Sequence, residues 1–403
     1  MKFAHISDVH IGGWREPAMR TLNMQAFLRA MEMCCSEKVD FILIAGDLFN
    51  TALPAIEMLH SVTLELRKLK ELEIPVYVIP GSHDFSASGK TMIDVLEGAG
   101  MLVNVCRGEV VGQKLRLRFT VDARTSAKIT GMLGKKGMLD RVYYEDLDRE
   151  YLEKEGGYKI FLFHTALTEL KPRGLEQMDT YPVSLLPKGF EYYAGGHVHY
   201  PLEYSAEGYK KVAQPGALFP NNFKELEDLG SGGFYIITDG SVEWKEVKVK
   251  HRAVIAIDCE GKSAEEVYDA AVEALDQKEV ADAVVLLRFT GMIKGGKVSD
   301  VPFQAIFDRI YGRKAYLVLK NAAALKSEEF EEINVQQNSV DEIEDALIRE
   351  HVQQVSVGLS VEEEVLLTKE LMGALSTEKK EGETVRDFEE RVKREGMSVL
   401  KFG

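Results

Sequence analysis

Five short polar segments follow apolar, strand-like runs in the sequence, and each carries side chains that bind metals or transfer protons. In chain order they are SDVH, GDLF, GSHD, FHT and GGHVH, which contain Asp8, His10, Asp47, Ser82, His83, Asp84, His164, His197 and His199. Each motif alone is weak, because an Asp-x-His triplet is often a polar turn and two histidines two apart on a strand are often a surface pair. Together they are a stronger signal, since six of the nine histidines belong to these segments or lie near them.

The ligand types indicate a metal and a reaction. Carboxylates with imidazoles, and no thiolates, suit Mn²⁺, Fe or Zn²⁺ better than a structural Cys-rich zinc site or an all-oxygen calcium site. Two aspartates and four metal-competent histidines exceed what one ion needs, and a carboxylate such as Asp47 can bridge two ions about 3.5–4 Å apart. Such a pair activates a water and stabilises the attacking and leaving oxygens of a displacement at phosphorus. These residues therefore predict a phosphoesterase.

The elements around these segments alternate between strand and helix. FAHIS precedes a helical pattern through Leu22, Phe27, Ala30 and Cys34, followed by FILIAGD, a helix that opens near Pro54, and VYVIPGSHD. This βαβαβ order predicts a parallel sheet with helices on its faces, in which ligands bind at the carboxyl ends of the strands. Short strands from KIFLFHT to VEWKEVKV predict a strand-rich second half of this domain.

Composition describes an ordinary globular protein of 403 residues, 45% hydrophobic and 29% charged, with room for two or three domains. The net charge of −15 is concentrated in residues 251–403, where 31 acidic against 20 basic residues leave −11, while residues 1–250 carry only −4. A phosphate-binding cleft is compatible with that near balance, because bound divalent cations offset acid further. Four cysteines without CxxC spacing, no membrane-length apolar run and no leader predict a cytoplasmic protein with core thiols and no membrane partner.

The C-terminal third changes character twice. Residues 251–325 predict a compact β-α-β-α-β unit, and residues 326–403 are acidic and helical, with Ser360 and Glu363 in a capping-box pattern. A last segment places an apolar stripe on one helix face, formed by Val385, Phe388 and Val392. That stripe either packs against its own domain or forms a partner-binding helix after a polar linker. We predict domain boundaries that give 1–250, 251–325 and 326–403.

Taken in order, the patterns DxH, GDxx, GxHD, a strand-end histidine and GHxH resemble the calcineurin-like metallophosphoesterase superfamily. The opening MKFAHISDVHIG, the IAGDLF stretch, the QPGAL turn and the small α/β region after them are similar to the SbcD-type nucleases of DNA double-strand-break repair, whose eukaryotic member is called Mre-eleven. The resemblance suits an archaeal or bacterial source. It implies an α/β fold, a four-layer α/β/β/α sandwich with a small α/β domain that caps the DNA cleft and a helical C-terminal tail.

The resemblance also implies roles. The metal ligands would form two Mn²⁺ sets that share Asp47, namely Asp8, His10 and His199 for one ion, and His164, His197 and Ser82 for the other; Mg²⁺, Fe or Zn²⁺ are alternative ions. His83 would protonate the leaving oxygen or stabilise the transition state, with Asp84 orienting it. The family digests DNA ends, as an exonuclease on duplex and an endonuclease on single strands, and it works as a homodimer with a coiled-coil ATPase partner of the Rad-fifty or SbcC type.

Two positions depart from the family pattern. Ser82 stands where asparagine is usual, and Asn50 stands where relatives often carry histidine. A serine hydroxyl is a shorter and poorer donor to a hard cation, so we expect the second ion to bind more loosely. Three explanations stay open for Ser82: an intact site with a bridging water, an impaired natural enzyme, or an engineered substitution. Two other functions stay open as well, a small-substrate metallophosphatase or phosphodiesterase and a catalytically silent scaffold.

Overall fold

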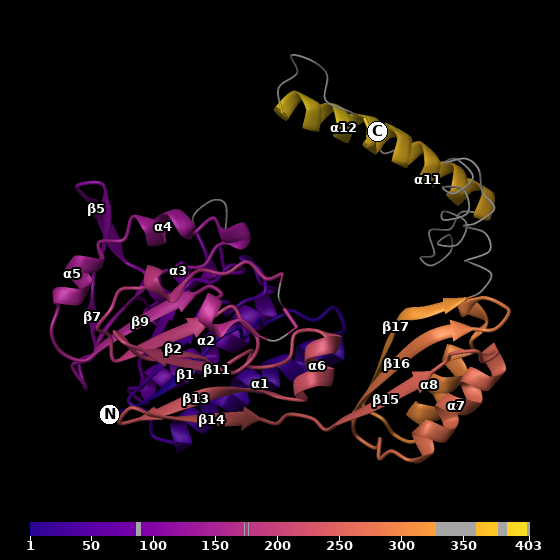
Figure 1. Cartoon of the computed structure of the whole chain (residues 1–403), viewed down its shortest axis with the longest axis horizontal. Helices are drawn as coiled ribbons and strands as arrows, with labels where there is room; N and C mark the ends of the chain where they lie inside the picture. Colours follow the sequence, from indigo (N-terminus) through magenta and orange to yellow (C-terminus); the bar gives the residue numbers. More distant parts are fainter. Residues whose placement is uncertain (86–89, 173, 176, 328–359, 378–384, 401–403) are drawn as a thin grey trace. The chain divides into compact units, whose positions relative to one another are not determined.

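The structure is a computed structural model that describes residues 1–85, 90–172, 174–175, 177–327, 360–377 and 385–400 (Figure 1). Its compactness divides the chain into two units. The larger unit comprises Met1–Ile257, Ala271–Phe289 and Phe303–Ala322, and the smaller comprises Asp258–Ala270, Thr290–Pro302 and Ala323–Gly403. Every residue of the predicted site lies in the larger unit.

Two six-stranded sheets form the centre of the larger unit. The first has the order β14 (Ser241–Val247), β13 (Gly232–Thr238), β1 (Lys2–Ile6), β2 (Phe41–Ala45), β3 (Val76–Ile79) and β4 (Val103–Asn104). The second has the order β11 (Leu202–Ala206), β12 (Tyr209–Gln214), β10 (Tyr192–Gly196), β9 (Lys159–His164), β8 (Lys128–Gly131) and β7 (Thr120–Val121). Strands β1 to β4 run parallel, and so do β8, β9, β10 and β12.

The apolar side chains between and around the sheets create four layers. Phe41 and Leu43 of β2 and Ile160 and Leu162 of β9 are buried in one cluster, so the sheets pack face to face. Helices α1 (Pro17–Ser36), α2 (Ile56–Glu71) and α3 (Met92–Gly98) share a second core with the first sheet. A third core lies on the second sheet, where α4 (Arg141–Glu145) and α5 (Arg149–Lys154) supply buried side chains. The predicted α/β/β/α sandwich is confirmed (Figure 1).

Helix α1 is the first helix that the apolar spacing predicted. Pro17 occupies the first turn of α1, where its missing N–H is tolerated and its fixed φ suits a helix. Leu22, Phe27, Ala30 and Cys34 are all buried, which follows from their helical spacing on one face. Shorter elements of the larger unit include the hairpin β5 (Gly108–Val111) and β6 (Lys114–Leu117), three single-turn 3₁₀ helices and the helix α6 (Phe223–Leu229).

The chain after residue 251 contains the predicted β-α-β-α-β order. It runs through β15 (Arg252–Asp258), α7 (Ala264–Asp276), β16 (Val284–Ile293), α8 (Phe303–Gly312) and β17 (Leu317–Ser327), and the three strands form one sheet.

Two helices represent the C-terminal segment, α11 (Val361–Leu375) and α12 (Val385–Val399), and they pack against each other. The capping box at the start of α11 is confirmed, because Ser360 Oγ accepts from the Glu363 N–H at 3.3 Å and the Glu363 carboxylate accepts from the Ser360 N–H at 2.9 Å. Much of the predicted linker, residues 328–359 and 378–384, lies outside the described residues, as does the side chain of Val385. Among the helices that are described, none is both long and apolar enough to cross a bilayer.

Candidate metal centre

The predicted site residues lie at the carboxyl ends of strands from both sheets. Asp8 follows β1, Asp47 follows β2, Ser82 follows β3, His164 is the last residue of β9 and His197 follows β10. Parallel strands end at one edge of a sheet, and here two such edges meet. The fold therefore gathers side chains that are far apart in the sequence: Asp8, His10, Asp47, Ser82, His83, His164, His197 and His199.

Three groups of these side chains have ligand atoms within 4.8 Å of one another: Asp8, His10 and His199; Asp8, Asp47 and His164; and His10, Asp47 and His83. Within the first group, the Nε2 atoms of His10 and His199 are 3.1 Å apart. That is close to the spacing of two nitrogens that share one ion at about 2.1 Å each. Asp8, His10 and Asp47 each belong to two groups, so the three groups form one continuous cluster.

The ring of His164 is held so that one of its nitrogens faces the cluster. His164 Nδ1 donates to the Ala45 carbonyl at 2.8 Å, and its Nε2 lies 3.2 Å from Oδ2 of Asp47. This Nε2 is buried and forms no well-aligned hydrogen bond, so its close polar contact is the ionic one with Asp47. Buried polar atoms are nearly always satisfied, and metal-binding histidines typically donate their other N–H to a carbonyl or carboxylate. The arrangement of His164 therefore fits a metal ligand.

The backbone of the centre is strained at four of the predicted metal ligands. Asp8, His10, Asp47 and His197 have φ values of 50°, 48°, 54° and 88°, and they are four of the eleven described non-glycine residues with positive φ. Each such residue costs on the order of 1–3 kcal/mol, and such costs persist where function requires the conformation. Four candidate ligands thus hold strained backbone conformations, while the other seven such residues lie elsewhere in the described chain.

Two glycines let the loops of the centre approach each other. A Cβ added to Gly46, which has φ of 88°, would lie 2.3 Å from His164 Nδ1. A Cβ added to Gly81 would lie 2.2 Å from Oδ1 of Asp47. Packing therefore requires glycine at positions 46 and 81, because any side chain there would displace a candidate ligand.

Burial and neighbouring charges shift the titration of the centre. Burial lowers the pKa of His10 to about 3. Burial alone would raise the pKa of Asp47, but His164 outweighs it and holds the pKa of this carboxyl well below its usual range. Burial likewise opposes a charge on His164, yet the Asp47 carboxylate raises its pKa to about 10. The charges of Asp47 and His164 thus stabilise each other, and a cation bound at this centre would displace the His164 proton.

His83 belongs to the third ligand group, and its ring is fixed from one side. Its backbone N–H donates to Oδ1 of Asp47 at 2.7 Å, and its Nδ1 donates to the Asn50 carbonyl at 2.9 Å. Its ring centroid is 4.8 Å from that of His10. Nε2 is therefore the nitrogen of His83 that remains for a substrate or a metal.

Asp84 differs from its expected role. Its buried carboxylate accepts three backbone N–H bonds, from Leu48 at 3.1 Å, Phe49 at 2.9 Å and Gly81 at 3.0 Å. The oxygens of Asp84 are thus directed at main-chain amides, and the ring of His83 is oriented by Asn50 instead. Asp84 ties the loop after β2 to the loop after β3.

Ser82 and His197 occupy less direct places. Ser82 is buried, and its Oγ donates to Oδ2 of Asp47 over a long 3.4 Å. The His197 N–H donates to both carboxylate oxygens of Asp8 at 3.0 Å, while its exposed ring lies 5.3 Å, centroid to centroid, from that of His164. The ring of His197 is not part of the three groups found among the described residues.

His5 is a core residue. Its ring bonds the Tyr192 hydroxyl at 2.9 Å and the Gly195 carbonyl at 3.1 Å, and burial lowers its pKa to about 3. Both ring nitrogens are engaged inside the fold, so His5 does not contribute to the metal centre.

Sequence reasoning missed Glu225. Its carboxylate accepts from His199 Nδ1 at 2.9 Å, so His199 has the same kind of support as His164. Glu225 also receives N–H bonds from Asn221 and from the Asn222 side chain, at 2.8 and 2.5 Å, and Asn222 caps α6. The spacing of Asn222 and Glu225 is a capping pattern, which signals a helix start but does not reveal a partner 26 residues away.

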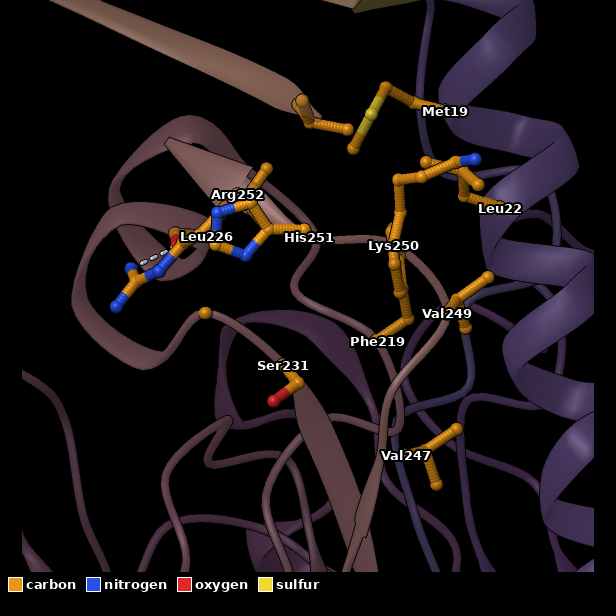
Figure 2. A pocket seen from close by; sticks show the side chains of 12 residues that line it. Met19, Leu22, Phe219, Leu226, Ser231, Val247, Val249, Lys250, His251 and Arg252 are labelled. Atoms are coloured by element: carbon orange, nitrogen blue, oxygen red, sulfur yellow. Dashed lines mark hydrogen bonds between the residues drawn. The ribbon is translucent and has the colours of Figure 1, made fainter. Parts of the chain in front are cut away.

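The opposite end of α6 is anchored by two arginines. Arg252 donates to the Leu226 carbonyl at 2.5 Å and also to the Glu227 carbonyl, next to a small pocket that Met19 and Leu22 of α1 line (Figure 2). Arg288 forms a two-pronged ion pair with the Glu227 carboxylate, with Nε at 2.7 Å from Oε1. The helix that presents Glu225 to His199 is therefore fixed at both ends.

Comparison with known proteins agrees with this geometry. The profile of the calcineurin-like phosphoesterase family matches residues 1–201. Residues 1–201 are a calcineurin-like phosphoesterase domain. Together with the three ligand groups, this phosphoesterase domain indicates a site for two metal ions.

The relatives extend the similarity beyond the phosphoesterase domain. The DNA double-strand break repair protein Mre11 of Archaeoglobus fulgidus is 26% identical over 84% of this chain and 77% of its own length. The protein of the same name from Methanopyrus kandleri is 28% identical over 66% of this chain and 61% of its own. An uncharacterized metallophosphoesterase of Bacillus subtilis, YhaO, is 27% identical over 61% of this chain and 59% of its own length. The chain thus spans about three-fifths of the length of the last two relatives.

Proposed function

We propose that this protein is a Mn²⁺-dependent DNA nuclease that degrades DNA ends in double-strand-break repair. The observation that carries the proposal is a phosphoesterase domain in which two ligand groups share Asp47, and in which His83, a member of one of them, has Nε2 available for a substrate. The relatives named as double-strand break repair proteins support DNA as the substrate. In this proposal residues 1–250 are the nuclease domain, residues 251–325 cap the DNA and residues 326–403 bind the partner.

Two cations held by these groups would supply the nucleophile and neutralise charge on the phosphate. In the hydrolysis, the oxygen of water forms a new bond to phosphorus as the bond to the leaving nucleotide oxygen breaks. His83, when protonated, donates its Nε2 proton to that leaving oxygen and regains a proton from solvent, while Asn50 keeps the ring in place. Glu225 keeps His199 oriented, and Asp84 keeps the two loops together.

The test uses linear duplex, single-stranded and hairpin DNA, each labelled at one end, incubated with the full chain in Mn²⁺, Mg²⁺ or EDTA. Cleavage is expected with Mn²⁺ and is expected to stop in EDTA. Asp47→Asn is the matched control, because it keeps the size of the side chain and removes the charge shared by two ligand groups. Cleavage that persists in Asp47→Asn would reveal a contaminating nuclease and count against the proposal.

A small-substrate phosphatase or phosphodiesterase is the second candidate, because the ligand groups do not specify the ester and one relative is named only as a metallophosphoesterase. Hydrolysis of p-nitrophenyl phosphate or its bis-ester, with all three DNA substrates left intact, would favour it. Bound metal without hydrolysis of any substrate would instead favour a silent scaffold, the alternative that Ser82 motivates.

The partner proposal concerns α11 and α12. Leu366 is 60% exposed on α11, and Leu375 and Met397 are exposed as well, so this helix pair leaves apolar surface for a coiled-coil ATPase. Deletion of residues 385–403 is expected to abolish co-purification with a co-expressed Rad-fifty-type partner while DNA cleavage by the isolated chain persists. Leu366→Glu tests the same surface without truncation. A deletion variant that unfolds would favour packing against its own domain.

The homodimer proposal concerns the start of α2. Ile56 is 79% exposed, and Leu53 and Leu64 add exposed apolar surface nearby. We expect the chain to elute as a dimer in size-exclusion chromatography with light scattering, and Ile56→Glu to give a monomer. A monomeric parent protein would contradict this proposal.

A further inference from the structure

A groove of about 280 Å³ opens directly from the candidate centre. Ser82 and His83 line one side of it, and Phe85, Lys135 and Lys136 are also among its lining residues. We call it the Lys135 groove. His83 belongs to a ligand group and also lines the groove, so this space is open to the group bonded to the oxygen that His83 would protonate.

The lysines of the groove are placed there by close packing. The Gly134 N–H donates to the Pro80 carbonyl at 3.0 Å, so the chain before Lys135 is bonded to the turn that precedes Ser82. A Cβ on Gly134 would lie 2.5 Å from the His164 carbonyl oxygen and 2.6 Å from Cδ2 of its ring. Only glycine allows the chain to pass so close to the metal centre, and the next two residues are the lysines.

The groove combines positive charge with aromatic surface. Nζ of Lys135 lies 4.7 Å from the ring centroids of both Phe85 and Tyr143 and donates to the Tyr143 hydroxyl at 2.7 Å. Phe85 nevertheless stays 38% exposed. Lys136 is exposed too, and within the described part of the chain neither lysine forms an ion pair within 4.0 Å, although Asp140 is near enough to Lys135 for their charges to interact. One lysine held against an open aromatic ring and a second, exposed lysine beside it suit a ligand with both an anionic and a flat aromatic part.

We propose that the Lys135 groove is the subsite for the nucleotide on the leaving-oxygen side of the scissile phosphate. Phe85 stacks on its base, Lys136 pairs with its next phosphate, and Lys135 holds the Phe85 ring in place through the cation–π contact. The size of the groove agrees with one unpaired nucleotide, since small-molecule sites begin at about 300 Å³. The inference rests on the proposed nuclease function and narrows it, because a base can reach Phe85 only after it has left the duplex.

The first test measures binding without catalysis. Fluorescence anisotropy with a labelled single-stranded oligonucleotide in EDTA compares the full chain with Phe85→Ala, Lys136→Ala and the control Tyr151→Ala. Tyr151 is a matched control because it is 39% exposed, has Arg116 4.6 Å over its ring and is not among the residues that line the groove. Loss of one stacked base weakens binding about 5- to 150-fold, and loss of one phosphate contact reduces the salt slope by about 0.7.

The second test separates this inference from the proposed function. Cleavage of the oligonucleotide and of bis(p-nitrophenyl) phosphate is measured in Mn²⁺, and Phe85→Ala is expected to lose at least tenfold more activity on the oligonucleotide than on the small ester. A parent protein that hydrolyses only the small ester would defeat the nuclease proposal. DNA cleavage by the parent, with Phe85→Ala and Lys136→Ala both binding and cleaving like Tyr151→Ala, would overturn the groove subsite alone. Equal binding by all four proteins in EDTA overturns it as well.

Discussion

Replacement of Ser82 by asparagine tests whether the centre is deficient at one ligand position. In the structure, Ser82 reaches the centre only through a 3.4 Å hydrogen bond to Oδ2 of Asp47, which is long for an O–H···O bond. Removing it is expected to cost less than about 1 kcal/mol of free energy of unfolding. The side chain borders the Lys135 groove, so the two additional heavy atoms of asparagine have space.

The expected gain is in metal binding. An amide oxygen that reaches the ion adds a direct ligand, and changes even one step further from a metal typically alter affinity or activity about 10–100-fold. We therefore expect Ser82→Asn to lower the half-saturating Mn²⁺ concentration for cleavage at least tenfold, or about 1.4 kcal/mol. Calorimetric titration should resolve one tight and one weak Mn²⁺ site in the parent protein, and two tight sites in Ser82→Asn.

Two controls keep this prediction specific. Thr51→Asn adds an amide to another residue that lines the groove and should leave the Mn²⁺ titration unaltered. In a His164→Ala background the gain from Ser82→Asn should vanish, because the second ion has lost a candidate ligand. If the parent protein already binds two ions equally tightly and asparagine brings no gain, the serine loop is sufficient and the reasoning is refuted.

Three further substitutions examine the rest of the centre. His83→Ala should reduce cleavage about 10²–10⁴-fold without loss of bound Mn²⁺, measured by atomic absorption. The control His60→Ala, at an exposed histidine of α2, should change neither cleavage nor bound Mn²⁺. A loss of metal from His83→Ala that matches its loss of cleavage would make His83 a ligand. Glu225→Gln should weaken Mn²⁺ binding about 10–100-fold in calorimetry, while Asp228→Asn on the same helix should not, and equal affinities would show that His199 needs no carboxylate. In denaturant titration, Gly46→Ala should lower the free energy of unfolding about 1–3 kcal/mol more than Gly112→Ala. Both glycines have positive φ, but only a Cβ at Gly46 would meet a neighbouring ring. Equal losses of stability would contradict the packing argument.

The sequence predicted those features of the centre that depend on strand ends. Asp8, Asp47 and His164 follow or end buried strands, and the parallel arrangement of those strands brings their carboxyl ends to one place. Periodicity predicted α1 in the same way, because the spacing of its apolar residues reflects the face that it buries. The order and spacing of residues were therefore sufficient for features that depend on neighbouring residues in the chain, such as strand ends and the buried face of a helix.

Long-range pairings were not accessible from the pattern. Nothing local distinguishes Asp84, whose oxygens bond three main-chain amides, from a carboxylate that would orient the neighbouring imidazole of His83. Glu225 reads as part of a helix cap, and its bond to His199 depends on how the chain returns to the sheet after β12. The sequence also gives no sign of which histidines are core residues, since His5 precedes the SDVH motif and is nevertheless engaged by Tyr192 inside the fold.

The same distinction explains why strain and glycine are the clearest marks of the centre. Asp8 and Asp47 hold left-handed backbone conformations that side chains with a Cβ rarely adopt, and Gly46 and Gly134 lie against the His164 ring where no Cβ fits. Each of these features lowers stability when considered alone. They occur together because two loops and a strand end have to bring carboxylates and imidazoles within a few ångströms, and that approach leaves no space for ordinary turns. A chain selected only for stability would relax these positions, so their coincidence with the ligand groups is itself an argument that the centre binds metal and acts on a substrate.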